Sequence, residues 1–104
     1  MNDKFLQFLG LAKKAGRLIE GYNKCEEAVK YKKLHLLIMS NEASQNTKDK
    51  FLRLSERYNI PIIEGYSKEE LGYALGREEI NVLALTDLKM SHKLKELWLD
   101  KSNN

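Results

Sequence analysis

The sequence has little of what stabilises small secreted domains or membrane proteins. Of its 104 residues only one is cysteine and one is proline. A single cysteine cannot form an internal disulfide, and it has no partner cysteines for a structural zinc site of the usual spacing. No uninterrupted apolar run exceeds the four residues from Leu36 to Met39, whereas a membrane helix needs roughly 18. These absences exclude a disulfide scaffold and a membrane-spanning helix.

The composition is that of one ordinary globular domain. Hydrophobic residues make up 42% of the chain and charged residues 32%, which favours a buried core over disorder. A chain of 104 residues has room for one domain and not for two. We expect that domain to span residues 1–100, with a short tail at 101–104. The opening residues lack the features of a signal peptide, so we expect a cytoplasmic protein.

The sequence also lacks recognisable catalytic and cofactor motifs. Its glycines do not have the spacing of a phosphate-binding loop or of a dinucleotide fingerprint. His35 and His92 have no cysteine, histidine or carboxylate nearby at metal-ligand spacing. Cys25 falls on the inner side of an expected helix, where cysteine is usually a core residue. We therefore expect no enzymatic activity, no metal, no cofactor and no small-molecule substrate.

Positive charge is concentrated in the first third of the chain. The whole sequence has 18 Lys and Arg against 15 Asp and Glu, a net charge of +3. Residues 1–33 alone carry a net +4, so the remainder is slightly negative. A basic face attracts phosphate groups, and a solvated lysine-rich surface is the alternative interpretation.

Helical and strand patterns alternate along the chain. Helical spacing of apolar residues follows Asp3, Asn23, Ser67 and Asp87, and also spans Thr47 to Tyr58. Short apolar runs between the helices predict four strands, at Leu18–Ile19, Leu34–Met39, Ile60–Glu64 and Val82–Leu85. Such alternation predicts an α/β fold, a single-domain three-layer α/β/α sandwich with a small four-stranded mixed sheet.

Side chains that cap helices are placed at several expected starts. Asp3 and Asp87 precede the first and last helices, and Ser67 with Glu70 has the spacing of a capping box. Asn23, followed three residues later by a glutamate, predicts the same arrangement at the second helix.

The segment from Lys13 to Lys24 combines basic side chains with a glycine-containing turn. Gly21 permits close approach of the backbone to a partner, and Asn23 is expected to open a helix whose free amides favour an anion. The surrounding positive charges are those of Lys14, Arg17 and Lys24. The alternative is an ordinary turn with a helix cap, in which the lysines only offset the dipole of the first helix.

The order of these motifs resembles the ribosomal protein L7Ae superfamily of RNA-binding proteins. The resemblance extends from about Phe5 to Leu97. It is carried by Gly21-Tyr22-Asn23, the run Leu34–Met39 leading into Ser40–Thr47, Ile60-Pro61 and Ser67–Gly76. The stretches Phe8–Gly16 and Ala43–Thr47 are similar to those of short bacterial members.

The resemblance implies an α/β/α sandwich that binds kink-turn or related structured RNA. Gly21 and Asn23 match a Gly-x-Asn motif whose asparagine contacts bases of sheared G·A pairs. The loop from Arg77 to Asn81 matches the loop that contacts an extruded nucleotide, with Ile80 at its edge. Bulges and splayed bases are the usual features by which structured RNA is recognised.

Two positions depart from the pattern that the resemblance implies. Many kink-turn binders carry an acidic residue directly after the asparagine and a lysine three positions further on. Here those positions hold Lys24 and Glu27. The loop Arg77-Glu78-Glu79 is also more charged than the small apolar loop of strong binders. General RNA binding tolerates these changes better than tight kink-turn specificity does.

The sequence therefore supports the hypothesis of a monomeric, non-catalytic RNA-binding protein, with structured RNA, ribosomal RNA included, as its partner. Two alternatives stay open: a protein-interaction module on the same scaffold, and an accessory domain of an RNA-modifying enzyme. The residues that we predict to form the RNA-binding face are Lys14, Arg17, Gly21, Asn23, Lys24, Arg77 and Ile80.

Overall fold

A computed structural model describes residues 3–102, in which five helices alternate with four strands. The helices are α1 (Lys4–Lys14), α2 (Tyr22–Tyr31), α3 (Gln45–Tyr58), α4 (Lys68–Ala74) and α5 (Leu88–Ser102). The strands are β1 (Leu18–Glu20), β2 (Leu36–Met39), β3 (Ile62–Glu64) and β4 (Val82–Leu85). The strands β2 and β3 each begin two residues later than their apolar runs predict.

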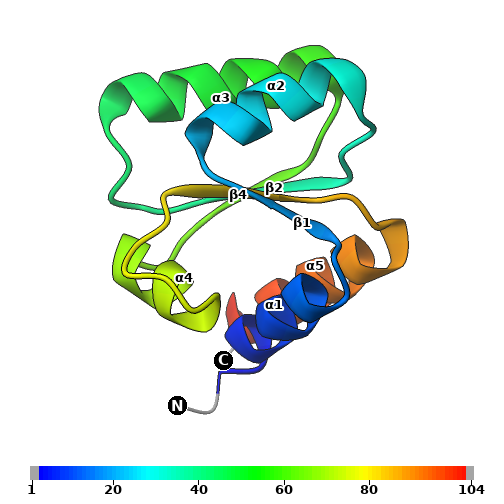
Figure 1. The fold of residues 1–104 in the computed structure, drawn as a ribbon, viewed down its shortest axis with the longest axis vertical. Coiled ribbons are helices and arrows are strands. Elements are labelled where there is room, and N and C mark those ends of the chain that lie inside the picture. Colours follow the sequence, from blue (N-terminus) through cyan, green and yellow to red (C-terminus); the bar gives the residue numbers. More distant parts are fainter. Residues whose placement is uncertain (1–2, 103–104) are drawn as a thin grey trace.

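The four strands form one mixed sheet in the order β1-β4-β2-β3. β4 pairs antiparallel with both β1 and β2, and β2 pairs parallel with β3. Helices α2 and α3 cover one face of this sheet, and α1, α4 and α5 cover the other (Figure 1). The predicted three-layer α/β/α sandwich with a small four-stranded mixed sheet is confirmed. Pro61 immediately precedes the edge strand β3. Because proline has no amide hydrogen, this position avoids the loss of a hydrogen bond in the middle of the sheet.

The two central strands separate two hydrophobic clusters. Alternate residues of β2 and β4 point to opposite faces, because successive side chains of a strand alternate. One set packs with α1, α4 and α5: Leu36, Ile38, Leu83 and Leu85. The other set packs with α2 and α3: Leu37, Met39, Val82 and Ala84. Both strands therefore read as continuous apolar runs without polar alternation.

Three of the predicted helix caps are confirmed. Leu6 N donates to Asp3 Oδ1 at 3.0 Å, and Met90 N donates to Asp87 Oδ2 at 2.8 Å. At α4, Ser67 Oγ accepts from the backbone of Glu70, whose carboxylate accepts in return from Ser67 N. These bonds join residues three apart in sequence, so local pattern is sufficient to predict them.

The last helix extends further than predicted. α5 continues to Ser102, and Lys101 Nζ lies 3.0 Å from Asp3 Oδ2 and 5.1 Å from the centroid of the Tyr66 ring. The expected tail at 101–104 is therefore wrong for its first residues, and residues 103–104 lie outside the described part. The contact between Lys101 and Asp3 joins opposite ends of the chain, which the sequence pattern does not reveal.

Asp3 connects α1, which it caps, to the loop after β3 and to α5. Its carboxylate accepts hydrogen bonds from the Tyr66 hydroxyl at 2.9 and 3.0 Å and from Lys101. The Tyr66 ring stacks on Phe5, and both rings contact Trp98 of α5. Burial raises the pKa of Asp3, but the hydrogen bonds from Leu6 N, Lys101 and Tyr66 outweigh it and hold the pKa below its usual range. The folded state therefore favours the ionised carboxylate.

Asp3→Asn is expected to lower the free energy of unfolding at neutral pH by about 1 kcal/mol, because charge-assisted hydrogen bonds are lost. A pKa lowered by folding stabilises the protein above the unfolded value, near 3.8, and that stabilisation disappears as the pH falls through the folded value. The difference between wild type and variant should therefore vanish under acid. Urea unfolding of wild type and variant, repeated from neutral to acid pH, measures this difference. Asp49→Asn, which changes an exposed aspartate of α3, is the control. A difference independent of pH would contradict the assigned role.

Candidate nucleic-acid interface

A strained glycine turn joins β1 to α2. Gly21 has φ 102° and ψ 157°, a conformation almost restricted to glycine. Its N–H donates to Val82 O at 2.9 Å, and its own carbonyl accepts from Cys25 N at 3.0 Å. Gly21 is thus the N-cap of α2, and the prediction that Asn23 caps this helix with Glu26 as a capping box is wrong. Within the described chain, no side chain caps α2.

The first turn of α2 presents polar side chains to solvent. Asn23 and Lys24 are both exposed, and they are the second and third residues of the helix, which begins at Tyr22, one residue before its predicted start. Tyr22 orients this turn, because its ring meets Phe51 of α3 edge-on with centroids 5.2 Å apart. The uncapped amides and Lys24 together make this turn attractive to an anion.

Cys25 lies beneath the same turn and is a core residue, as predicted. It is fully buried, and its thiol donates to Ile19 O at 3.5 Å. Burial raises the pKa of the Cys25 thiol to about 12, with a further contribution from the Glu20 carboxylate. A thiol of this kind stays protonated at neutral pH and is a poor nucleophile.

Glu20, which directly precedes Gly21, binds a side chain from the loop after α4. Its side chain is only 14% exposed and binds two cations: Arg77 Nε lies 2.6 Å from Oε1, and Lys13 Nζ lies 3.5 Å from Oε2. The Lys13 ammonium also donates to Leu75 O at 2.5 Å. Arg77 is 54% exposed, so one side of its guanidinium stays open to solvent. The structure thus places the Arg77 guanidinium against Glu20, the residue directly before Gly21.

Backbone bonds hold the loop from Arg77 to Asn81 against α4. Arg77 N donates to Gly72 O at 2.8 Å, and Ile80 N donates to Lys68 O at 3.0 Å. Ile80 is only 7% exposed and belongs to the hydrophobic cluster under α1, α4 and α5. Its prediction as a surface contact is corrected: the Ile80 side chain anchors the loop instead.

Lys14 reaches the same region from α1. With Arg77 it lines a groove of about 780 Å³ between α1 and α4, whose wall includes the exposed Leu11 and Tyr73. Four carboxylates also line this groove, so Lys14 and Arg77 supply its positive charge at an otherwise acidic surface: Asp3, Glu69, Glu70 and Glu78.

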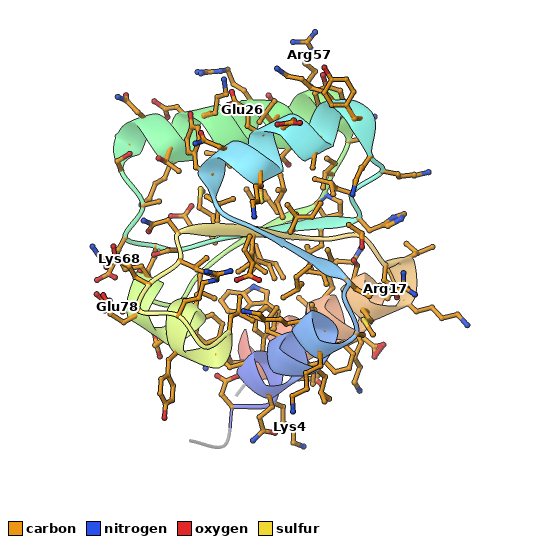
Figure 2. The ribbon with its side chains drawn as sticks, in the orientation of Figure 1. Lys4, Arg17, Glu26, Arg57, Lys68 and Glu78 are labelled. Atoms are coloured by element: carbon orange, nitrogen blue, oxygen red, sulfur yellow. The ribbon has the colours of Figure 1, made fainter. Side chains whose placement is uncertain are left out.

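Arg17 does not join this group. Its carbonyl accepts from Thr86 N at 3.0 Å, whereas Gly21 N donates to Val82 O, so the two residues lie at opposite ends of the β1–β4 pairing. Figure 2 shows Arg17 on one side of the molecule and Glu78, a neighbour of Arg77, on the other. An extended strand advances about 3.3 Å per residue, which separates Arg17 from Gly21 by roughly 13 Å.

Two residues of the candidate interface carry no signal that sequence reasoning detects. Glu20 and Lys13 organise it, but a glutamate at a strand end and a lysine in the last turn of a helix carry no distinctive local signal. Arg77, the partner of Glu20, is 57 positions away from it in the sequence, and Leu75, whose carbonyl accepts from Lys13, is 62 positions from that lysine. Such a contact is decided by the tertiary structure.

The family of the chain follows from comparison with known proteins. Residues 3–95 match the ribosomal protein L7Ae/L30e/S12e/Gadd45 family. The chain belongs to this family. The membership confirms the resemblance derived from the Gly21 turn and the motifs that follow it, and the L7Ae-type fold agrees with the observed sandwich.

Relatives within the L7Ae family match nearly the whole chain. "RNA-binding protein YlxQ" of Enterococcus faecium is 32% identical over 94 residues, covering 90% of each chain. The protein of the same name from Bacillus subtilis (strain 168) is 28% identical over 94 residues, covering 90% of this chain and 94% of the relative. Both relatives are bacterial and are matched over at least 90% of their own length, which agrees with the short bacterial members that Phe8–Gly16 and Ala43–Thr47 resemble.

A solved structure has the same L7Ae-type architecture. It is described as a protein with unknown function from Bacillus halodurans C and is 34% identical to this chain. The match covers 92% of this chain and 97% of that one, with a TM-score of 0.89.

Two further observations concern residues 3–102 only. Across this described range no helix is long and apolar enough to cross a membrane. Nor do three or more histidine, cysteine, aspartate or glutamate side chains of these residues gather where they could hold a metal ion.

Proposed function

We propose that this chain binds structured RNA of the kink-turn type through the start of α2 and the loop after α4. The observation that carries the proposal is the Glu20–Arg77 ion pair, which places a half-exposed guanidinium beside the uncapped first turn of α2. Asn23 and Lys24 are exposed on that turn. Membership of the L7Ae family and the name shared by the two YlxQ relatives support RNA as the partner.

Each group at this interface has a distinct role in the proposal. The Asn23 amide can both donate to and accept from base edges, so it supplies selectivity for splayed or sheared bases. Lys24, Arg77 and Lys14 contact phosphates and supply affinity that falls as salt rises. The Gly21 backbone lets the RNA approach the helix amides closely. Glu27, exposed one turn further along α2, limits the length of the anionic contact.

The departures at Lys24 and Glu27 shape the expected specificity. Lys24 adds positive charge next to Asn23, which strengthens phosphate binding to any RNA. Glu27 repels a phosphate at the position where many kink-turn binders carry lysine. We therefore propose that the chain binds RNA in general and prefers kink-turn RNA less strongly than kink-turn binders with lysine at that position do. The proposal includes a monomeric, non-catalytic protein that acts in the cytoplasm, with ribosomal RNA among its targets.

Titration of a kink-turn RNA and of a control duplex of equal length, at low and physiological salt, tests the proposal. A preference for the kink-turn that persists at physiological salt is the expected result. Equal, steeply salt-dependent binding would limit the function to nonspecific contact with RNA. Binding to neither RNA would overturn the proposal and favour the alternative of a protein-interaction module.

Asn23→Ala is expected to weaken kink-turn binding about tenfold and duplex binding much less, because only base contacts are lost. Since Gly21 is the cap, the free energy of unfolding should stay within about 0.5 kcal/mol of wild type. Arg77→Ala should weaken binding to both RNAs and reduce the salt slope by about 1.

Arg17→Ala is the matched control for Arg77→Ala, because it removes the same charge at the far end of β1. It should leave binding of a compact kink-turn RNA unchanged. Equal losses for Arg17→Ala and Arg77→Ala would refute a localised interface, and equal losses on both RNAs for Asn23→Ala would refute its contact with bases.

A further inference from the structure

A second basic surface lies at the other end of the sheet. It is a hollow of about 380 Å³ between the end of α2, the end of α3 and one side of α5. We call it the lysine hollow, after Lys32, Lys33 and Lys95, which line it together with His35, Tyr58 and Asn59. Of the lining residues, all within the described chain, none is acidic.

Backbone pairing places the lysine hollow opposite the Gly21 turn. His35 N donates to Leu85 O at 2.9 Å, at the end of β4, whereas Gly21 N donates to Val82 O at its beginning. Arg17 O pairs with Thr86 N at the same end as His35. Arg17 lies away from the Gly21 turn (Figure 2). Its positive charge is therefore at the same end of the sheet as the lysine hollow.

Exposed aromatic and apolar side chains accompany the positive charge. Tyr31, directly before Lys32, is 80% exposed, and Leu88 of the hollow is 49% exposed. The Arg57 guanidinium lies 5.7 Å from the centroid of the Tyr58 ring, which brings a further cation close to this side chain of the hollow. Glu26, on the preceding turn of α2, is engaged by Lys50 of α3.

We propose that the lysine hollow binds a single-stranded RNA segment that continues from the RNA held at the Gly21 turn. The inference rests on the proposed function, because it extends the same RNA along α2. That helix has ten residues and is about 15 Å long. Its exposed side chains lead from Asn23 past Glu27 to Lys30, next to the hollow, so the connecting RNA passes α2 with its phosphates turned away from the Glu27 carboxylate.

The chemistry of the lysine hollow fits single-stranded RNA. Proteins bind single strands by combining a positively charged groove, which follows the phosphates, with aromatic side chains on which bases stack. A base entering the hollow packs against Tyr58 and Leu88, while Lys32, Lys33 and Lys95 contact the phosphates. Tyr31 provides a second stacking surface outside. A paired strand keeps its bases stacked internally, so a duplex cannot use these surfaces.

The test compares a kink-turn RNA with the same RNA carrying a single-stranded tail of about eight nucleotides, placed on either end in separate molecules. At least one tail is expected to increase affinity about tenfold at low salt, from two or more additional phosphate contacts. Annealing a complementary strand to that tail should abolish the gain. No gain from either tail, or an equal gain from the paired tail, would overturn the inference.

A charge-matched pair of variants locates the gain. Lys32→Ala with Lys33→Ala should remove most of it and lower the salt slope for the tailed RNA by about 1.4. The control, Lys4→Ala with Lys93→Ala, changes two exposed lysines outside the hollow and reduces the net charge equally, from +3 to +1. A gain that survives the first pair, or is lost equally in both pairs, would show that the hollow is not the site.

Tyr31 separates stacking from charge. Tyr31→Ala should reduce the gain about fivefold without changing the salt slope, and Tyr31→Phe should retain it, because stacking requires only the ring. The untailed RNA should bind wild type and all these variants equally. If wild type does not bind the untailed RNA, the proposed function fails; if it binds but gains nothing from a tail, only this inference fails.

Discussion

Gly21→Ala is expected to lower the free energy of unfolding by about 2–3 kcal/mol. The cause is backbone strain alone, since a Cβ built at Gly21 would have nothing within 4 Å while φ is 102°. The same change should weaken RNA binding at least tenfold. Any rotation that relieves the strain breaks the bond from Gly21 N to Val82 O and turns the first amides of α2 away. Urea unfolding and RNA titration measure the two effects.

Gly16→Ala and Gly76→Ala are the controls for Gly21→Ala. Both glycines have positive φ, at 72° and 73°, and open space around the missing Cβ. Their conformation is the left-handed region, which costs alanine only about 1 kcal/mol. They should therefore destabilise the protein less and leave kink-turn selectivity intact. Equal losses at all three positions would contradict a special role for the Gly21 conformation.

Gly72→Ala is expected to destabilise the protein by about 1–2 kcal/mol, although alanine is the better helix former. A Cβ at Gly72 would lie 2.6 Å from Glu79 Cα and 2.7 Å from Glu79 N. These are backbone atoms, so the loop from Arg77 to Asn81 must move away from α4. That movement disturbs the Arg77–Glu20 ion pair, and RNA affinity should fall as well.

Gly10→Ala in α1 is the matched control for Gly72→Ala. The nearest atom to its added Cβ would be Ala74 O at 3.4 Å, an ordinary contact. Alanine should then stabilise the helix by about 0.5–1 kcal/mol. Thermal unfolding distinguishes the two, since each kcal/mol shifts Tm by roughly 4–8 °C in a domain of this size. A Gly72→Ala protein more stable than wild type would show that the loop from Arg77 to Asn81 can move away from α4 without loss of free energy.

Much of the fold could be predicted because its signals are local. Asp3, Asp87 and the Ser67–Glu70 pair bond to atoms three residues away, and α3 ends at Tyr58, where its apolar spacing ends in the sequence. Asn23 was misassigned for an equally local reason. Gly21, two residues earlier, adopts a conformation that asparagine rarely reaches, and this starts the helix sooner.

The site was only partly predictable, because its members come from distant segments. A short sequence motif is sufficient to identify Gly21, Asn23 and Lys24, because they lie within four residues of one another. Arg17 lies only four residues before Gly21, but the intervening strand is extended and carries it to the other end of the sheet. Ile80 looked like a loop residue, yet the loop folds over α4 and buries its side chain.

The amino-acid sequence by itself determined the alternation of elements, the α/β class, the family and the turn at Gly21, since periodicity, caps and glycine spacing act over a few residues. Only the tertiary structure decided the strand order β1-β4-β2-β3 and the pairing of Glu20 with Arg77. It also decided the division of the basic residues between two ends of the sheet. Those features depend on contacts between segments far apart in the chain, where long-range packing determines which side chains meet.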